Sequence, residues 1–348
     1  MQVLGRLSIL CLGLVLSSIT IVVAQQRAIE DFETIERLEG LQKRIKSSDY
    51  FNSTTPETID VPELFASERE DLGPQFIVRR IPRRKWFDAY VDTQYFYSSN
   101  VNLAKNSFDA NHQDTAVWVN TLQLAIAPDP YEIFEGVALY PSVGFRYQWY
   151  NYGLLQGDDH LNRLDFDSQT TFAECRFVID DLWVVTAGFD WNRLVGHEEP
   201  NYQELYREYK PHWGVERLFP LAEDKAVSLG YHSSYHFTDV GEILPGLGQR
   251  DRNDRMTHTF SIVYTQVFFE KLFVQPFYNF ELKDFMAGLN GDLEEQVHLA
   301  GTSVTYFFND WSNVRAFFTY TRQNSNRTTS LEYEKWDGGG GLSLNFRF

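Results

Sequence analysis

Charged and imidazole side chains recur at alternate positions through the C-terminal three quarters of the chain. Residues two apart in a β-strand point to the same side of the sheet, so each strand would gather its charges on one face. On the inner face of a closed sheet, such charges either set the ion or solute preference of a water-filled pore or pair with one another and close a narrow lumen. The sequence leaves both interpretations open. The candidate lumen-lining residues are Asp88, Asp92, Arg146, Glu174, Arg176, Asp190, Glu216, His232, His236, Glu281, Lys283, Arg315 and Arg347.

His232 and His236 are the residues that a metal site would use first. Four positions apart on one strand face, they lie roughly 13 Å from each other, which is too far to hold one ion directly. A site would need a further ligand, such as Glu216 or Glu281, from neighbouring strands. We therefore interpret the pair as polar lumen residues and expect no metal and no other cofactor.

The sequence does not favour an enzyme. Ser233 and His232 are adjacent, so on a strand they face opposite sides and cannot form a nucleophile–base pair. No G-x-S-x-G motif is present. Asp158, Asp159 and His160 are the residue types that an omptin-like protease uses, but that similarity does not extend beyond residue type. We expect no catalytic residues.

About twelve segments from Trp86 onward alternate apolar and polar residues and have the length of a strand that crosses a bilayer, roughly 9–11 residues. Because lipid offers no hydrogen-bond partners, a sheet there must close on itself. This pattern predicts an all-β fold, a transmembrane antiparallel up-and-down barrel. The segments are 86–97, 114–126, 136–150, 164–179, 182–194, 209–219, 225–238, 256–269, 272–285, 295–308, 313–323 and 334–348.

The connections between these segments alternate in length. Short turns such as Asp180-Asp181 and Glu270-Lys271 alternate with longer polar loops such as 195–208 and 239–255, and 127–135 is the one long member of the short set. Short turns on one side and long loops on the other are typical of membrane barrels, and an even strand number leaves both chain ends at the short-turn side. Trp residues near both ends of the segments predict two aromatic girdles.

The first residues predict a secretory signal peptide over 1–24. Arg6 is followed by an apolar run, and Ala24 fits a small-residue cleavage site before Gln25. Cleavage would leave Cys175 as the one cysteine, so we expect no intrachain disulfide. We therefore divide the chain into a signal peptide (1–24), a periplasmic N-terminal helix and linker (25–85) and a barrel (86–348).

Residues 27–47 predict an amphipathic helix. Apolar residues from Ile29 to Ile45 recur every three or four positions, and charges fill the other face. Three positions are open for it: packed on the barrel mouth or a neighbour, self-associated, or inserted as a plug. Residues 48–85 carry scattered prolines and charges and predict a linker.

The last seven residues, 342–348, alternate apolar and polar and end in Phe348. They resemble the closing strand of bacterial outer-membrane β-barrels, in which a terminal Phe is recognised by the assembly machinery. Tyr97-Ser98-Ser99-Asn100-Val101 resembles the Y-D-S-N-V that follows the first strand of some β-barrel porins, with Ser98 where Asp is usual. The resemblance implies a porin-like outer-membrane barrel, a narrow channel for small polar solutes or ions. The alternative is a non-conducting structural or adhesive barrel closed by salt bridges or by the helix.

The formal net charge of −17, without a basic patch, argues against nucleic acid as a partner. The partners that we expect are outer-membrane lipid and lipopolysaccharide, the barrel-assembly machinery and small polar solutes. Divalent cations could join acidic loops to lipopolysaccharide phosphates, although solvated loops explain the same charges. These acidic positions are Asp158, Asp159, Asp165, Asp167, Glu198, Glu199, Asp292, Glu294 and Glu295.

Overall fold

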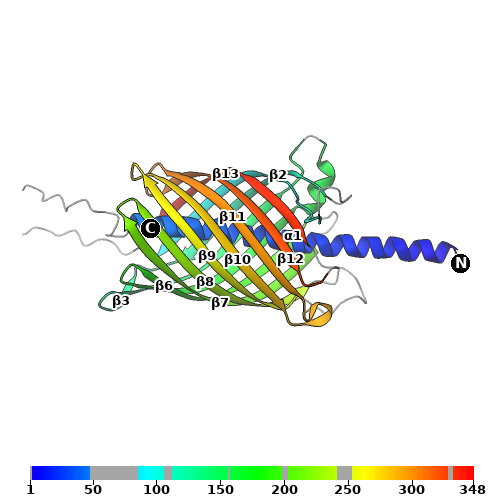
Figure 1. Ribbon diagram of the computed structural model, residues 1–348, viewed down its shortest axis with the longest axis horizontal. Coiled ribbons are helices and arrows are strands. Elements are labelled where there is room, and N and C mark those ends of the chain that lie inside the picture. Colours follow the sequence, from blue (N-terminus) through cyan, green and yellow to red (C-terminus); the bar gives the residue numbers. More distant parts are fainter. Residues whose placement is uncertain are drawn as a thin grey trace, which may run out of the picture.

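The computed structural model describes residues 2–47, 85–105, 112–155, 157–197, 203–240, 253–327 and 332–348. Within these ranges, one long helix precedes a closed antiparallel barrel of twelve strands (Figure 1). The prediction of an up-and-down barrel is therefore confirmed. The linker expected over 48–85 falls, except for Lys85, outside the described residues.

The chain begins with α1 (Gln2–Ser47), and two short 3-10 helices, η1 (Asp159–Leu164) and η2 (Gly288–Asn290), interrupt the loops. The strands are β1 (Phe87–Ser98), β2 (Thr115–Ile126), β3 (Tyr131–Phe134), β4 (Val137–Asn151), β5 (Phe166–Ile179), β6 (Trp183–Gly196), β7 (Gln203–Ala222), β8 (Lys225–Val240), β9 (Arg255–Phe268), β10 (Leu272–Phe285), β11 (Glu294–Phe307), β12 (Ser312–Ser325) and β13 (Tyr333–Arg347).

The ring closes where the first and last strands meet. β1 pairs with β13 from Asp88 opposite Arg347 to Ser98 opposite Asp337, and β2 pairs with β4. The short strand β3 pairs with the start of β4, which explains why the connection over 127–135 is longer than the other turns. Closure satisfies the backbone groups of both terminal strands, as a sheet in lipid requires.

The two ends of the barrel differ. At one end, which we call the short-turn end, tight turns join the strands and β1 begins and β13 ends. Asp180 and Asp181 in the β5–β6 turn both have positive φ, as do Phe269 and Glu270 in the β9–β10 turn, which is the geometry of a two-residue hairpin turn. At the other end, the long-loop end, β7 begins at Gln203 rather than at 209, because residues 203–208 pair with β6.

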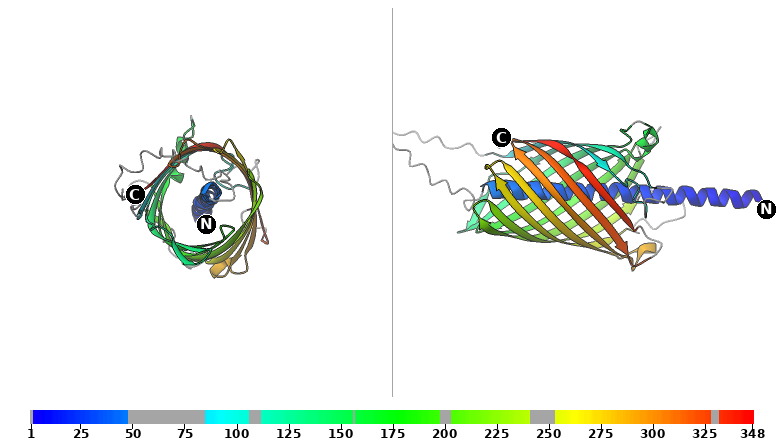
Figure 2. Two further views of the ribbon diagram at one scale, coloured as in Figure 1. Left: turned by 90° about the vertical axis from the view of Figure 1, so that its left-hand side faces the viewer. Right: turned by 45° about the horizontal axis from the view of Figure 1, so that its top comes forward.

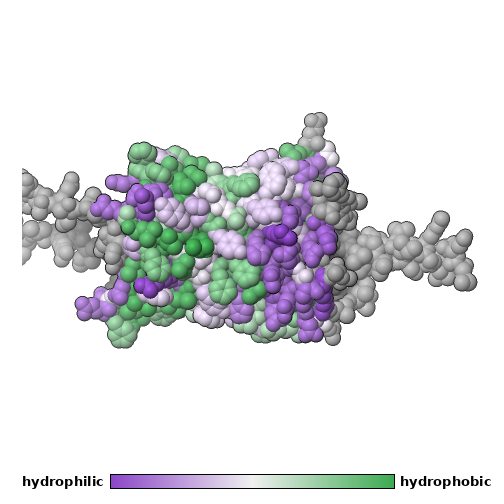
Figure 3. All heavy atoms as spheres, viewed as in Figure 1, coloured by the Kyte–Doolittle hydropathy of each residue, from purple (hydrophilic) through white to green (hydrophobic). Residues whose placement is uncertain are grey.

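The outer surface carries large apolar and aromatic side chains. Trp86, Trp183 and Trp311 are exposed at the short-turn end, and Trp149 and Trp336 are exposed toward the long-loop end. On the face shown in Figure 3, hydrophobic residues concentrate toward the short-turn end and hydrophilic residues toward the long-loop end. This distribution fits a lipid-facing band with strands that project beyond it on one side.

Candidate functional site: the helix-filled lumen

Helix α1 runs through the lumen along the barrel axis (Figure 2). At the long-loop end, Nε2 of Gln25 donates to the backbone oxygen of Leu164 at 3.2 Å. At the short-turn end, Nζ of Lys46 lies 2.7 Å from Asp310 in the β11–β12 turn. Residues 25–46 span roughly 32 Å at the rise of an α-helix, which is enough to thread the barrel from one end to the other.

This position places residues 25–47 of the helix inside the lumen (Figure 2). Of the three positions that the sequence left open, the structure shows the plug. The physical reason is complementarity: the apolar stripe of α1 meets apolar patches of the wall, and its carboxylates meet wall bases. The backbone of residues 2–23 continues α1 beyond the long-loop end (Figure 1).

Two apolar clusters hold α1. The first, which we call the seal, surrounds Ile29 at the long-loop end with side chains from β2, β4, β5, β6 and β7 and from η1, including Val119, Tyr150 and Phe166. The rings of Tyr150 and Phe166 stack at 4.3 Å. The second cluster packs the apolar stripe from Ile35 to Ile45 against β7 to β11. The seal packs against the helix at the long-loop end, whereas the second cluster packs against the helix nearer the short-turn end.

Acidic residues of α1 pair with basic residues of the wall. The contacts are Glu30 with Arg255 at 3.2 Å and Lys283 at 2.7 Å, Asp31 with Lys335 at 2.5 Å, Glu33 with Lys210 at 2.7 Å, Glu36 with Arg146, and Glu39 with Arg315 at 3.0 Å. Six different strands supply these bases. Buried charges need partners of this kind, since an unpaired one costs several kcal/mol.

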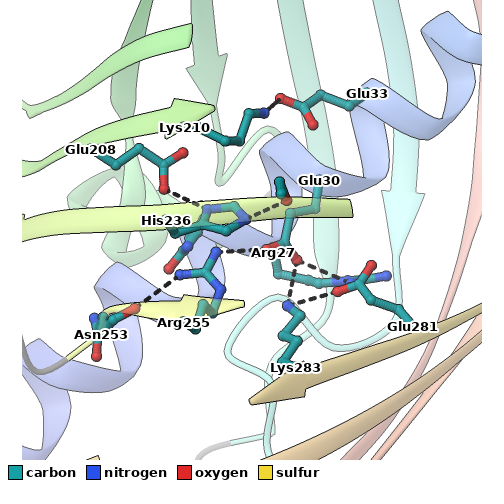
Figure 4. A network of polar contacts seen from close by, with 12 residues as sticks. Arg27, Glu30, Glu33, Glu208, Lys210, His236, Asn253, Arg255, Glu281 and Lys283 are labelled. Carbon is teal, nitrogen blue, oxygen red and sulfur yellow. Dashed lines mark hydrogen bonds and ion pairs between the residues drawn. The ribbon is translucent and has the colours of Figure 1, made fainter. Parts of the chain in front are cut away.

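Figure 4 shows the centre of this network around Glu30. Its carboxylate is shared by Arg255, Lys283 and the helix's own Arg27, and Arg27 also lies 3.7 Å from Glu281. One carboxylate thus connects α1 to β9 and β10. Breaking it would leave several cations without their common anion.

Most of these wall bases also have a carboxylate partner within the wall. Lys210 lies 3.1 Å from Asp190, Lys283 lies 3.1 Å from Glu281, Lys335 lies 3.1 Å from Asp337, and Arg315 lies 3.4 Å from Asp92. These bases would keep a partner if α1 left the lumen. If these bases paired only with α1, departure of the helix would leave them as unpaired charges. The wall carboxylates reduce that cost.

A cavity of about 530 Å³ lies between the polar face of α1 and the wall, chiefly β4 to β8 with residues of β1, β2, β9, β10 and β13 at its borders. It reaches the short-turn end, because Pro128 of the β2–β3 connection and Arg347 at the end of β13 line it. Arg37 of α1 and Arg176 of β5 also border it. The lining carries both signs of charge, so the space suits water and small polar solutes.

The structure brings most of the predicted lumen residues to this cavity. Three are instead buried in contacts between the helix and the wall or within the wall: Asp92, Lys283 and Arg315. The residues that line the cavity are Asp88, Arg146, Glu174, Arg176, Asp190, Glu216, His232, His236, Glu281 and Arg347.

Sequence reasoning missed three of the wall bases. Lys210 shares its strand face with Glu216, and Lys335 shares its face with Arg347, so strand parity would have found both. Arg255 and the buried Glu208 fell in predicted loops and carried no such signal. Within the described ranges, no group of three or more His, Cys, Asp or Glu side chains is arranged to hold a metal ion.

Several acidic residues for which the sequence left cation binding or solvated loops open have partners within the chain. Oδ1 of Asp165 accepts from the backbone N–H of Tyr152 at 2.7 Å, and Asp167, which lies on β5, contacts His197 at 2.9 Å. Glu198 and Glu199 lie outside the described residues.

Among the helices that the structure describes, none is both long and apolar enough to cross a bilayer.

The closed sheet, the apolar outer surface and the polar lumen define the fold of an outer-membrane β-barrel. No protein-family model matches the sequence, and no curated protein is detectably similar to it. Among solved structures, the chain is similar to the β-domain of the Bordetella autotransporter Brka, with 13% identity and a TM-score of 0.45 over 76% of this chain and 100% of that one.

It is also similar to the COG4313 outer membrane channel from Pseudomonas putida, with 10% identity and a TM-score of 0.48 over 75% of this chain and 96% of that one. The KdgM porin matches with 11% identity and a TM-score of 0.36 over 74% of this chain and 99% of that one. Identities and TM-scores this low do not identify a solute or an activity, and the barrel itself follows from the strand register described above.

Proposed function

We propose that this protein is an outer-membrane channel for small polar solutes or ions that is closed, in the conformation described, by its own helix α1. The observation that carries the proposal is the seal around Ile29, which packs apolar side chains about the helix at the long-loop end. The polar cavity beyond it reaches the short-turn end. A solute could enter that cavity but would meet a dry contact before it could cross.

The wall supports reversible opening. Four of the bases that pair with α1 keep a wall carboxylate within 3.4 Å, so displacement of the helix would leave few isolated charges in the wall. The carboxylates of α1 would then be hydrated outside the barrel.

Planar-bilayer recording of the full chain tests this proposal. We expect little conductance from the native protein and a clear rise for Ile29→Asp, which places a carboxylate in the seal. Ile133→Asp on the exposed strand β3 is the matched control. Equal conductance of the native protein and Ile29→Asp would reject closure by the seal.

A second candidate is a non-conducting structural or adhesive barrel. The observation in its favour is the depth of the Glu39–Arg315 pair, whose side chains are 4% and 2% exposed. If Ile29→Asp folds into the barrel and still passes no current, this second function is favoured. The expected contacts of Phe348 with assembly machinery and of the outer surface with lipopolysaccharide belong to both candidates.

A further inference from the structure

Three inward-facing side chains form a hydrogen-bonded relay beside the cavity. Oγ of Ser234 lies 2.9 Å from Nε2 of His236. Nδ1 of His236 lies 2.9 Å from Oε2 of Glu208 (Figure 4). Ser234 and His236 share a face because they are two apart on β8, and Glu208 lies on the neighbouring strand β7. A carboxylate at Nδ1 keeps the imidazole proton there, so Nε2 is free to accept the proton of the serine hydroxyl.

Glu208 is fixed in place by further donors. The hydroxyl of Tyr206 donates to it at 2.6 Å, and Nδ2 of Asn192 donates at 2.7 Å. Its residue is 5% exposed. Hydrogen bonds to a buried carboxylate stabilise its charged form, which is the form that orients an imidazole.

Nucleophilic catalysis requires a nucleophile that the substrate can reach, and of the three groups the serine is the most exposed. His236 and Glu208 are buried, whereas Ser234 is partly exposed and lines the cavity of about 530 Å³ together with His236. A substrate in the cavity would therefore meet the serine first. A pocket of this size accepts a small organic molecule.

The neighbouring strand β9 supplies a hydroxyl beside the serine, whereas His212 on β7 turns its Nε2 toward Asp190, 3.5 Å away. Ser234 is paired in register with Thr257 on β9 and with His212 on β7. Oγ1 of Thr257 and Nδ1 of His212 are buried and make no hydrogen bond within the described part of the chain. A hydroxyl without a partner, one strand away from a nucleophile, is suited to donate to an oxyanion.

We propose that Ser234, His236 and Glu208 form a hydrolytic site for small polar carboxylic esters that enter the lumen from the short-turn end. Oγ of Ser234 attacks the ester carbonyl carbon while its proton passes to Nε2 of His236. The carbon–oxygen bond to the leaving group then breaks, and His236 returns the proton to the leaving alcohol. Water attacks the acyl-serine by the same route, so the sum is ester plus water giving acid plus alcohol.

The substrate class follows from the surroundings of the relay. The cavity is bordered by both signs of charge, including Arg37, Arg176 and Glu174, and it faces the lumen rather than the lipid. A polar ester suits such a lining, whereas the acyl chains of a phospholipid do not. Sequence reasoning missed this site because Glu208 lies in a predicted loop, far in sequence from Ser234 and His236.

Labelling of the detergent-purified full chain with phenylmethylsulfonyl fluoride, followed by peptide mass spectrometry, tests the site. We expect one sulfonyl adduct on Ser234 and slow hydrolysis of p-nitrophenyl acetate. Ser234→Ala should abolish both signals, and His236→Gln should lower the labelling rate at least a hundredfold. Ser233→Ala is the matched control, because Ser233 is the adjacent serine on the opposite face of β8.

Two further measurements separate catalysis from a structural role. The native labelling rate should rise with pH as the imidazole loses its proton, and the His236→Gln variant should lose that step while keeping the heat-dependent gel migration of a folded barrel. An unlabelled Ser234, or equal labelling rates for native protein and His236→Gln, would overturn the proposal. Conductance plays no part in either readout, so this site and the channel proposal stand or fall separately.

Discussion

The two ends of the lumen hold the same helix in different ways. At the long-loop end, α1 is surrounded: the seal contacts it from β2 and β4 to β7, and the charges around Glu30 and Asp31 reach β9, β10 and β13. At the short-turn end, the apolar stripe of α1 packs against β7 to β11, Glu39 pairs with Arg315 of β12, and the remaining polar face borders the cavity. Closure and docking energy therefore concentrate at the long-loop end, while the short-turn end gives access to the interior.

Glu30→Lys should weaken the docking of α1 at the long-loop end more than any other substitution considered. The new cation would face Arg27, Arg255 and Lys283 without their shared carboxylate, which we expect to weaken helix docking by about 3–5 kcal/mol. Trypsin cleavage within α1 of the folded barrel should then accelerate by two orders of magnitude or more. Glu223→Lys in the exposed β7–β8 turn should leave the cleavage rate unchanged.

Ile29→Ala should have the next largest effect. The substitution removes buried methyl groups from the seal and should cost about 2–3 kcal/mol of docking, while the charge network stays intact. Bilayer recording should show more frequent openings than in the native protein, and Ile133→Ala on β3 should show none of this change. A native-like opening frequency in Ile29→Ala would mean that charge pairs alone close the lumen.

Much of this arrangement could be predicted from alternation along the strands. Parity placed Asp190, Arg315 and their counterparts on the inner face, because a residue's side of a strand is a local property. The position of α1 could not be predicted from local sequence. Glu39 and Arg315 are 276 residues apart, and their contact depends on strand tilt and register across the whole ring. The Ser234 relay shows the same division, with two members on one predicted face and Glu208 supplied by a strand extension that looked like a loop.

Cysteine substitution should reveal a moderate difference in water access between the cavity wall and the seal. In a Cys175→Ser background, Thr186→Cys on the cavity wall should react with a small water-soluble methanethiosulfonate at least ten times faster than Val119→Cys in the seal. The reason is solvent access, since a thiol packed among apolar side chains is neither ionised nor reached by the reagent. Equal rates at the two positions would show that water passes the seal.

The smallest effect should come from Lys46→Ala at the short-turn end. Nζ of Lys46, 2.7 Å from Asp310, lowers the pKa of that carboxyl group through a hydrogen bond and its charge. The pair thus stabilises docking above the ordinary carboxyl pKa and loses this contribution as the pH falls through the lowered value. Because the Asp310 side chain is 94% exposed, we expect less than about 1 kcal/mol, screened further by salt. Trypsin cleavage of α1 should change less than threefold. An acceleration as large as that of Glu30→Lys would show that the helix is anchored mainly at the short-turn end.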